Sequence, residues 1–223
     1  PLPRLRVLRV AREIGDRRRV ASTLNNIGGV YYSLGDLPNA RQRYEESLSV
    51  CREIGNRRGQ AVALNNLAEV LWLWGSLAEA GRLFEQALEI RRGIGDKAGV
   101  AVVLNNLARV QKDRGDLATA KRTCQESLKL REELGAKGST AETQGVLAEV
   151  LLEQGQLAEA EALARAAAEE FRKQKRADDE ASARGLLARC LLAQKKTAEA
   201  RMTVREAVGL AEKSQNRSMR LAV

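Results

Sequence analysis

Histidine is absent from the 223-residue chain, which removes the commonest general base and metal ligand of proteins. The chain also has no P-loop, no GxGxxG motif and no GxSxG motif. Its paired carboxylates, such as Glu45-Glu46 and Asp178-Asp179, are adjacent in sequence and have the pattern of exposed helix positions. We therefore expect a protein that is not an enzyme and that uses no cofactor and no metal ion.

Cysteine is scarce as well, with Cys51, Cys124 and Cys190 far apart in the chain. An odd number at such spacing is not a disulfide framework, so we expect buried thiols and a reducing, cytoplasmic location. No apolar run reaches the about 20 residues that a membrane span needs, and no signal peptide is visible. The first residue is Pro1 rather than Met, so the missing signal carries little weight.

Aromatic residues make up 3% of the chain, which leaves few platforms on which nucleic-acid bases could stack. The net charge of +9 is nevertheless high enough to raise that function. The positive excess lies in residues 1–20 and 181–223, whereas residues 141–180 carry ten acidic and five basic side chains. Because the excess forms no continuous stripe, we do not expect nucleic acid as a partner.

An internal repeat of 40 residues is the main feature that the chain does have. Alanine recurs at Ala40, Ala80, Ala120, Ala160 and Ala200. Glycine recurs at Gly35, Gly75, Gly115 and Gly155, and Lys195 stands in the place of the next glycine. A third series contains Gly28, Ala68, Ala108, Ala148 and Ala188, and a Leu-Asn-Asn-(Ile/Leu) run begins at Leu24, Leu64 and Leu104.

Each repeat has the pattern of two helices. Leu64, Leu67 and Leu71 follow helical spacing, Gly75 is placed to end that helix in a left-handed conformation, and Ser76 is placed to cap the next one. The same cap position is occupied by Asp16, Asp36, Asn56, Asp96 and Asp116. Short turns predict antiparallel neighbours, and the small residues predict close contact between helices.

This pattern resembles the tetratricopeptide repeat (TPR), through Leu67-Ala68, Leu71, Gly75, Ala80, Phe84 and Ala87. The 40-residue form is similar to the repeats of kinesin light chains, of GoLoco-associated adaptors and of bacterial signalling ATPases. The resemblance implies an all-α fold, a right-handed α-solenoid of antiparallel helix pairs, whose role is to bind other proteins.

The resemblance divides the chain into five repeats with a helix before them. The second helix of a truncated repeat covers 1–15, and the repeats cover 17–55, 57–95, 97–135, 138–175 and 177–213. The last repeat is degenerate, and residues 214–223 are a tail or the start of a further helix. Gly145-Val146 and Gly185-Leu186 replace the Asn pair, so we expect the last two repeats to be structural or differently specialised.

Both ends of the predicted array lack a polar capping helix. We therefore expect a segment of a longer array or of a multidomain protein. The alternative is that the ends pair with another copy, with Leu5, Leu8 and Ile14 forming an exposed apolar strip.

In the family that the chain resembles, the first helix of each pair lines a concave groove. By that resemblance the peptide-binding residues are Asn25, Asn26, Tyr32, Asn65, Asn66, Glu69, Trp72, Asn105, Asn106, Arg109 and Lys112. The Asn pairs need a reason, because Asn is a poor residue for the middle of a helix. An amide can read the backbone of an extended peptide, and we expect at least one Asn of each pair to face the groove. The alternative is that both members hold neighbouring helices together.

Trp72 has the better groove position of the two tryptophans, and Trp74 the better position for packing near the turn. Arg109 and Lys112 could bind a carboxylate or phosphate, whereas Glu142, Glu149 and Glu153 would make the later part of the groove acidic. We predict a non-catalytic scaffold that binds a peptide or partner protein. The alternative is a regulatory, sensor or self-assembly segment of a larger signalling protein, for example one attached to an NTPase domain.

Overall fold

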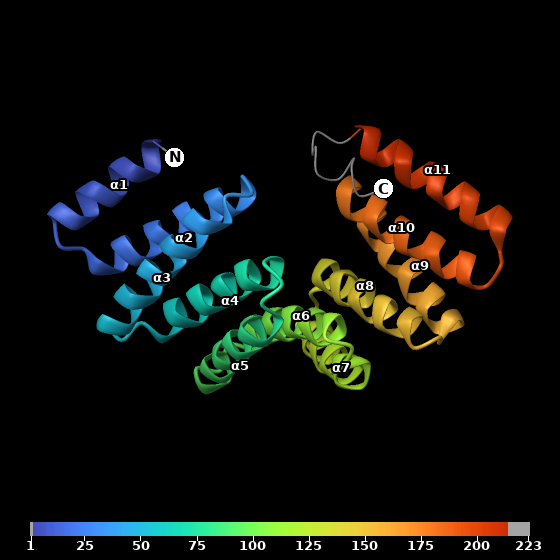
Figure 1. Ribbon diagram of the computed structural model, residues 1–223, viewed down its shortest axis with the longest axis horizontal. Coiled ribbons are helices and arrows are strands. Elements are labelled where there is room, and N and C mark those ends of the chain that lie inside the picture. Colours follow the sequence, from blue (N-terminus) through green and yellow to red (C-terminus); the bar gives the residue numbers. More distant parts are fainter. Residues whose placement is uncertain (1, 214–223) are drawn as a thin grey trace. The chain divides into compact units, whose positions relative to one another are not determined.

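The structure is a computed structural model that describes residues 2–213, all of them in helices or in the turns between helices (Figure 1). The helices are α1 (Leu2–Glu13), α2 (Arg17–Ser33), α3 (Leu37–Glu53), α4 (Arg57–Leu73), α5 (Leu77–Gly93), α6 (Lys97–Asp113), α7 (Leu117–Glu133), α8 (Lys137–Glu153), α9 (Leu157–Lys173), α10 (Ala177–Ala193) and α11 (Thr197–Lys213). The all-α class is therefore confirmed for these residues. The predicted tail, residues 214–223, lies outside the described residues.

The turns follow the chemistry expected from the sequence. Gly75 has a φ of +78°, which favours glycine, and it separates α4 from α5. At the next helix start the Asp96 carboxylate accepts a hydrogen bond from the Gly99 amide at 3.0 Å. Ser76 occupies the predicted cap position of α5 but makes no side-chain cap bond. Lys175 and Lys195 adopt a φ of 57° and 62° where the earlier turns have glycine.

Two compact units make up the chain, residues 1–114 (unit 1) and residues 115–223 (unit 2). Within each unit, helices that follow one another in the chain pack together, and α4 also contacts α2 and α6. The recurrent small residues allow this packing. Ala80 is fully buried, and at Gly28 an added Cβ would come within 2.6 Å of the Tyr44 ring.

The core at the start of unit 1 is an apolar cluster between three helices. Leu8 and Ala11 of α1, together with Val50 and Cys51 of α3, pack around residues of α2. The members from α2 are Val20, Ala21, Leu24 and Ile27. Each is at most 7% exposed, so this three-helix seam excludes water.

The exposed strip that we predicted on the first helix needs correction. Leu8 is 5% exposed, because it belongs to the core cluster just described. Leu5 and Ile14 are exposed as predicted, at 39% and 64%, and Val7 and Val10 are exposed as well, at 45% and 42%. By helical spacing Val7, Val10 and Ile14 share one side of α1, next to the side of Leu8 and Ala11 that packs against α2.

The three cysteines are buried, as expected, and none of them forms a disulfide bond within the described residues. Burial raises the pKa of the Cys51 and Cys190 thiols above the ordinary value, so neither is activated as a thiolate. Among the described helices, none combines the length and the apolar character required to cross a bilayer.

Candidate functional site

Hydrogen bonds between asparagine amides connect the first helices of unit 1. Asn66 of α4 donates from Nδ2 to Asn25 Oδ1 of α2 at 3.0 Å. One repeat later, Asn106 of α6 donates to Asn65 Oδ1 of α4 at 3.2 Å. We call this series the amide ladder. Its members lie side by side because α2, α4 and α6 carry the Asn pair at the same helical position and α4 contacts both α2 and α6.

Glu69 lies at the centre of the amide ladder. Its Oε1 accepts hydrogen bonds from Asn65 Nδ2 at 2.7 Å and from Asn106 Nδ2 at 2.8 Å. Burial raises the pKa of Glu69, and those bonds together with the charge of Arg109 lower it in part. The Glu69 carboxylate is thus half-buried and interacts with residues of α4 and α6. It lies on the same face as Tyr32 of α2.

Trp72 joins this face to the end of α6. The Arg109 guanidinium lies over the Trp72 ring, 4.2 Å from its centre, and Trp72 Nε1 donates to Asp113 Oδ2 at 2.5 Å. Lys112 Nζ lies 3.5 Å from the other carboxylate oxygen of Asp113. Trp74 is placed differently, since it is 42% exposed at the end of α4 and its ring faces Arg41 of α3 at 5.7 Å.

The predicted site residues differ in how far their side chains are buried. Asn65 and Asn105 are buried, whereas Asn25, Asn66 and Asn106 are half-buried and Asn26 is exposed. The remaining predicted members, Tyr32, Glu69, Trp72, Arg109 and Lys112, are all half-buried. The Asn105 Oδ1 atom is buried without a hydrogen-bond partner, so the ladder ends there on an unsatisfied acceptor.

Tyr44 of α3 belongs to this face, although sequence reasoning did not find it. Its ring packs on Gly28, and burial raises its pKa to about 12, with the Glu69 charge as a second cause. The available signal was the match of sizes, because the one glycine in the series of small residues in the first helices faces this Tyr. The described residues contain no group of three or more acidic or cysteine side chains suited to a metal ion.

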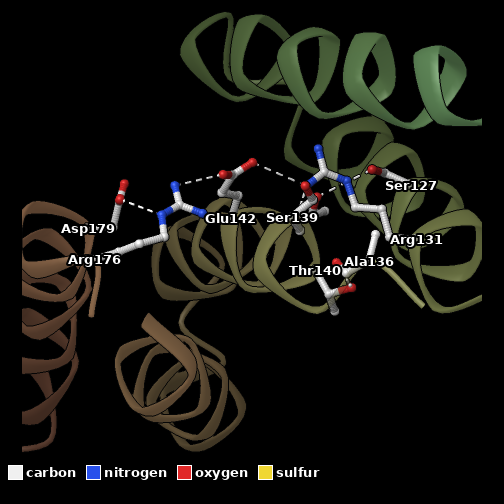
Figure 2. A network of polar contacts seen from close by, with 9 residues as sticks. Ser127, Arg131, Ala136, Ser139, Thr140, Glu142, Arg176 and Asp179 are labelled. Carbon is white, nitrogen blue, oxygen red and sulfur yellow. Dashed lines mark hydrogen bonds and ion pairs between the residues drawn. The ribbon is translucent and has the colours of Figure 1, made fainter. Parts of the chain in front are cut away.

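In unit 2, ion pairs connect Glu142 of α8 to residues outside that helix (Figure 2). Glu142 pairs with Arg131 of α7 at 3.3 Å and with Arg176 at 2.9 Å, and Arg176 also pairs with Asp179 at 2.8 Å. Arg131 also donates to the Ser139 carbonyl. Glu142 is therefore engaged within the fold, although its sequence position suggested an acidic groove lining.

Comparison with known proteins supports these observations. A family model described as the MalT-like TPR region matches residues 16–222. The fold is similar to a putative kinesin light chain from Podosopora anserina with nearly identical TPR-like repeats. That likeness has a TM-score of 0.68 and 18% identity, over 87% of this chain and 95% of that chain. No curated protein matches the sequence.

Two further solved structures resemble the chain over part of their own length. One is a Signal Transduction ATPase with Numerous Domains (STAND) protein with a tetratricopeptide repeat sensor from Pyrococcus horikoshii. It matches with a TM-score of 0.78 and 18% identity, over 96% of this chain and 34% of that chain. The other is the Rap conjugation gene regulator of the plasmid pLS20 in complex with the Phr* peptide. It matches with a TM-score of 0.80 and 14% identity, over 95% of this chain and 59% of that chain.

The predicted fold class is confirmed by these likenesses together with the packing of consecutive helices. The predicted resemblance to tetratricopeptide arrays is confirmed by the family model, which covers most of the sequence. The chain belongs to the MalT-like TPR family.

Proposed function

We propose that the chain is a non-catalytic binding scaffold whose unit 1 holds an extended peptide segment of a partner protein. The peptide lies across the first helices α2, α4 and α6. The observation that carries the proposal is the pairing of Trp72 with Arg109, beside the amide ladder. Trp and Arg are among the residue types that most often dominate the free energy of protein binding, and both of these side chains are half-buried.

Each part of this face offers a different interaction. The Arg109 guanidinium lies over the Trp72 ring and makes no hydrogen bond or ion pair with a described residue, so its N–H groups can donate to a carboxylate. Asn25 and Asn66, half-buried at one end of the ladder, present amide groups of the kind that pair with peptide N–H and C=O groups. The preferred ligand is therefore an extended segment with an acidic residue near Arg109.

The solved Rap regulator supports this proposal, because a protein of similar fold was solved with a peptide bound. The TPR family, to which the chain belongs, is one whose members typically bind rather than catalyse. The remaining groove residues, including Lys112 and Tyr32, would then surround the ligand without contributing equally to affinity.

The test is selection of peptides from a random phage-displayed library on the intact chain, followed by calorimetry with the selected peptides. We expect Trp72→Ala and Arg109→Ala to weaken binding by about tenfold or more, since each removes half of the stacked pair. Trp74→Ala is the matched control, because it removes the same side chain from the same segment but away from the amide ladder. Equal affinity of the Trp72→Ala variant and the unaltered chain would contradict the proposal.

A second candidate function is that of a sensor or assembly segment within a larger signalling protein. It is favoured by the likeness to a STAND protein with a tetratricopeptide repeat sensor, in which the matched part is 34% of the chain. The exposed valines Val7 and Val10 on α1 would serve assembly in this case. The two functions are compatible, because the amide ladder and the exposed side of α1 are different surfaces.

A further inference from the structure

Tyr44 of α3 is a buried side chain whose hydroxyl the fold does not use. The residue is 3% exposed, and its ring packs on Gly28 of α2. Its hydroxyl makes no hydrogen bond with a described residue, and unlike the Asn105 Oδ1 atom it is not sealed from solvent. A buried tyrosine usually finds a partner for its hydroxyl, and a phenylalanine would fill the same space. The hydroxyl therefore needs another explanation.

The Tyr44 hydroxyl lies beside Gly29, where α2 has no side chain. A Cβ on Gly29 would lie 3.8 Å from the hydroxyl oxygen, which is an ordinary contact, so packing within the fold does not require glycine there. Glycine inside a helix is nevertheless destabilising relative to alanine. The equivalent positions of the next two first helices carry the long side chains of Glu69 and Arg109. The missing side chain at Gly29 leaves the Tyr44 hydroxyl open to a ligand.

Glu69 of α4 presents an unpaired charge to the same face. Its Oε1 atom accepts hydrogen bonds from Asn65 and Asn106, whereas Oε2 accepts none from a described residue and the carboxylate forms no ion pair with one. A glutamine oxygen would serve both amides as well, so the amide ladder requires an acceptor but no charge. A half-buried carboxylate without a cation is costly to desolvate. The negative charge is therefore not explained by the fold.

Tyr32 of α2 lies near these two groups. Burial raises the pKa of both Tyr32 and Tyr44, and the charge of Glu69 raises it further in each case. The Tyr32 hydroxyl, like that of Tyr44, makes no hydrogen bond with a described residue. Two neutral hydroxyl oxygens and one carboxylate oxygen therefore lie near one another, each able to accept a hydrogen bond.

Arg109 of α6 does not fill this place. Its charge lowers the pKa of Glu69 in part, but its guanidinium lies over the Trp72 ring and forms no ion pair with Glu69 among the described contacts. Lys112 lies 3.5 Å from Asp113. An incoming chain therefore meets an unpaired carboxylate on α4 and an unpaired guanidinium on α6.

We propose that Tyr32, Tyr44 and Glu69 bind a primary ammonium group of the peptide ligand, supplied by a lysine side chain or by the amino terminus. An ammonium has three N–H donors and no acceptor, which matches one carboxylate oxygen and two hydroxyl oxygens. The inference rests on the peptide-binding function proposed above and gives the ligand a second charge requirement.

The positions of Glu69 and Arg109 also set the spacing of charges in the ligand. The two residues occupy equivalent places on the neighbouring first helices α4 and α6. Packed helices lie about 8–10 Å apart, and an extended chain advances about 3.3 Å per residue. The ammonium group therefore belongs about two or three residues from the acidic residue that binds Arg109.

The test measures by calorimetry how the peptides selected on the intact chain depend on their ammonium groups. In each peptide, lysine is replaced by norleucine and, separately, the amino terminus is acetylated, so that the two sources are distinguished. We expect one of these changes to weaken binding to the unaltered chain by about tenfold or more. With Glu69→Gln, which keeps the acceptor of the amide ladder, the same change should weaken binding by about twofold or less.

Tyr44→Phe and Tyr31→Phe form a matched pair for the hydroxyl. Tyr44→Phe keeps the ring on Gly28 and should weaken binding by about fivefold at an unchanged melting temperature. Tyr31 packs against the apolar cluster of α1, α2 and α3, so Tyr31→Phe should have no effect on binding. Gly29→Leu should leave the fold intact and weaken binding, because the added side chain covers the Tyr44 hydroxyl.

The outcomes separate this inference from the function on which it rests. Peptides that require Trp72 but lose the same affinity on removal of the ammonium with Glu69 as with Glu69→Gln would overturn the ammonium site alone. Equal affinity of the Tyr44→Phe and Tyr31→Phe variants would do the same. Failure to select any peptide would overturn both proposals. The melting temperature identifies a variant that does not fold, and the charge and hydroxyl variants then decide independently of each other.

Discussion

Tyr44 and Gly28 show at the scale of single residues how the small positions of the repeat work. An alanine Cβ at Gly28 would lie 2.6 Å from Cε1 of the Tyr44 ring, closer than atoms approach in real structures. At the neighbouring Gly29 the nearest atom would be the Tyr44 hydroxyl at 3.8 Å, an ordinary contact.

We expect Gly28→Ala to destabilise the chain by about 1–3 kcal/mol, because the buried ring has to move. Gly29→Ala, in the same helix, should be neutral or stabilising by up to about 1 kcal/mol, since alanine favours the helix. Chemical denaturation of the two variants measures the difference. A Gly28→Ala variant as stable as Gly29→Ala would show that Tyr44 does not pack as described.

The role of the amide ladder could not be predicted from single residues of the sequence. Both open interpretations, binding a peptide and holding neighbouring helices together, place Asn at the same positions. Asn65 bonds within its helix to Glu69 and accepts a bond from Asn106, while Asn66 reaches Asn25. The structure thus gives the pairs a part in connecting the helices, and peptide binding by the half-buried members stays a prediction.

At the scale of helices, the caps distinguish starts that are chemically satisfied from those that are not. Asp96 accepts the Gly99 amide at 3.0 Å and also pairs with Arg91, and its pKa is lowered chiefly by that amide bond. Ser76 stands at the same position of α5 without a side-chain bond.

Asp96→Ala should therefore cost about 1–2 kcal/mol, because it leaves an amide and a half-buried arginine without their partner. Ser76→Ala should change the stability by no more than about 0.5 kcal/mol, since no cap bond is lost. Thermal unfolding of both variants provides the comparison, and equal costs would refute the distinction between the two caps.

Glu161 joins α9 to the turn that precedes α11. Lys196 and Gln194 each donate to Glu161 Oε2 at 2.7 Å, and Arg165 pairs with Oε1 at the same distance. The Lys196 bond is the first cause that lowers the pKa of Glu161 to about 2, well below the ordinary value of 4.5. A lowered carboxyl pKa stabilises the fold above the unfolded pKa, and this contribution is lost as the pH falls toward the folded pKa.

Glu161→Gln should accordingly lower the stability at neutral pH, and the deficit should shrink as the pH is reduced from about 5 to about 2. Glu153→Gln is the control, because Glu153 is exposed and makes no ion pair with a described residue. The measurement is denaturant unfolding across that pH range. A deficit for Glu161→Gln that does not change with pH would contradict the assignment.

At the scale of the whole molecule, the exposed apolar side of α1 bears on assembly. Val7, Val10 and Ile14 share one side of that helix, whereas Ser47 and Val50, the equivalents of the two valines on α3, are 2% and 7% exposed. Within the array, a first helix covers these positions. The side of α1 is therefore shaped to receive a helix of that kind.

We expect the chain to associate reversibly at high concentration through this side of α1, as measured by sedimentation velocity. Val10→Glu should weaken the association, because it places a charge within the apolar contact. Val102→Glu changes an exposed valine of α6 that is 45% exposed, and it serves as the matched control. A chain that stays monomeric at every concentration would contradict the prediction.

Most of the helical architecture could be predicted, because the same helix and turn signals recur in each 40-residue repeat. Gly75 and Asp96 mark a helix end and a helix start by local backbone chemistry alone. Leu8 was placed wrongly because helical spacing gives the positions of side chains around an axis without saying which side meets a neighbour. Tyr44 was missed for the same reason, since its partners come from α2 and α4.

The sequence by itself determined that the chain is an array of helix pairs without histidine chemistry, because periodicity, turn residues and composition are local properties. Tertiary structure decided which asparagines connect the helices, how Glu69 comes to be half-buried, and where the Tyr44 hydroxyl lies. These features depend on contacts between residues that are distant in the sequence, and such contacts exist once the helices have packed.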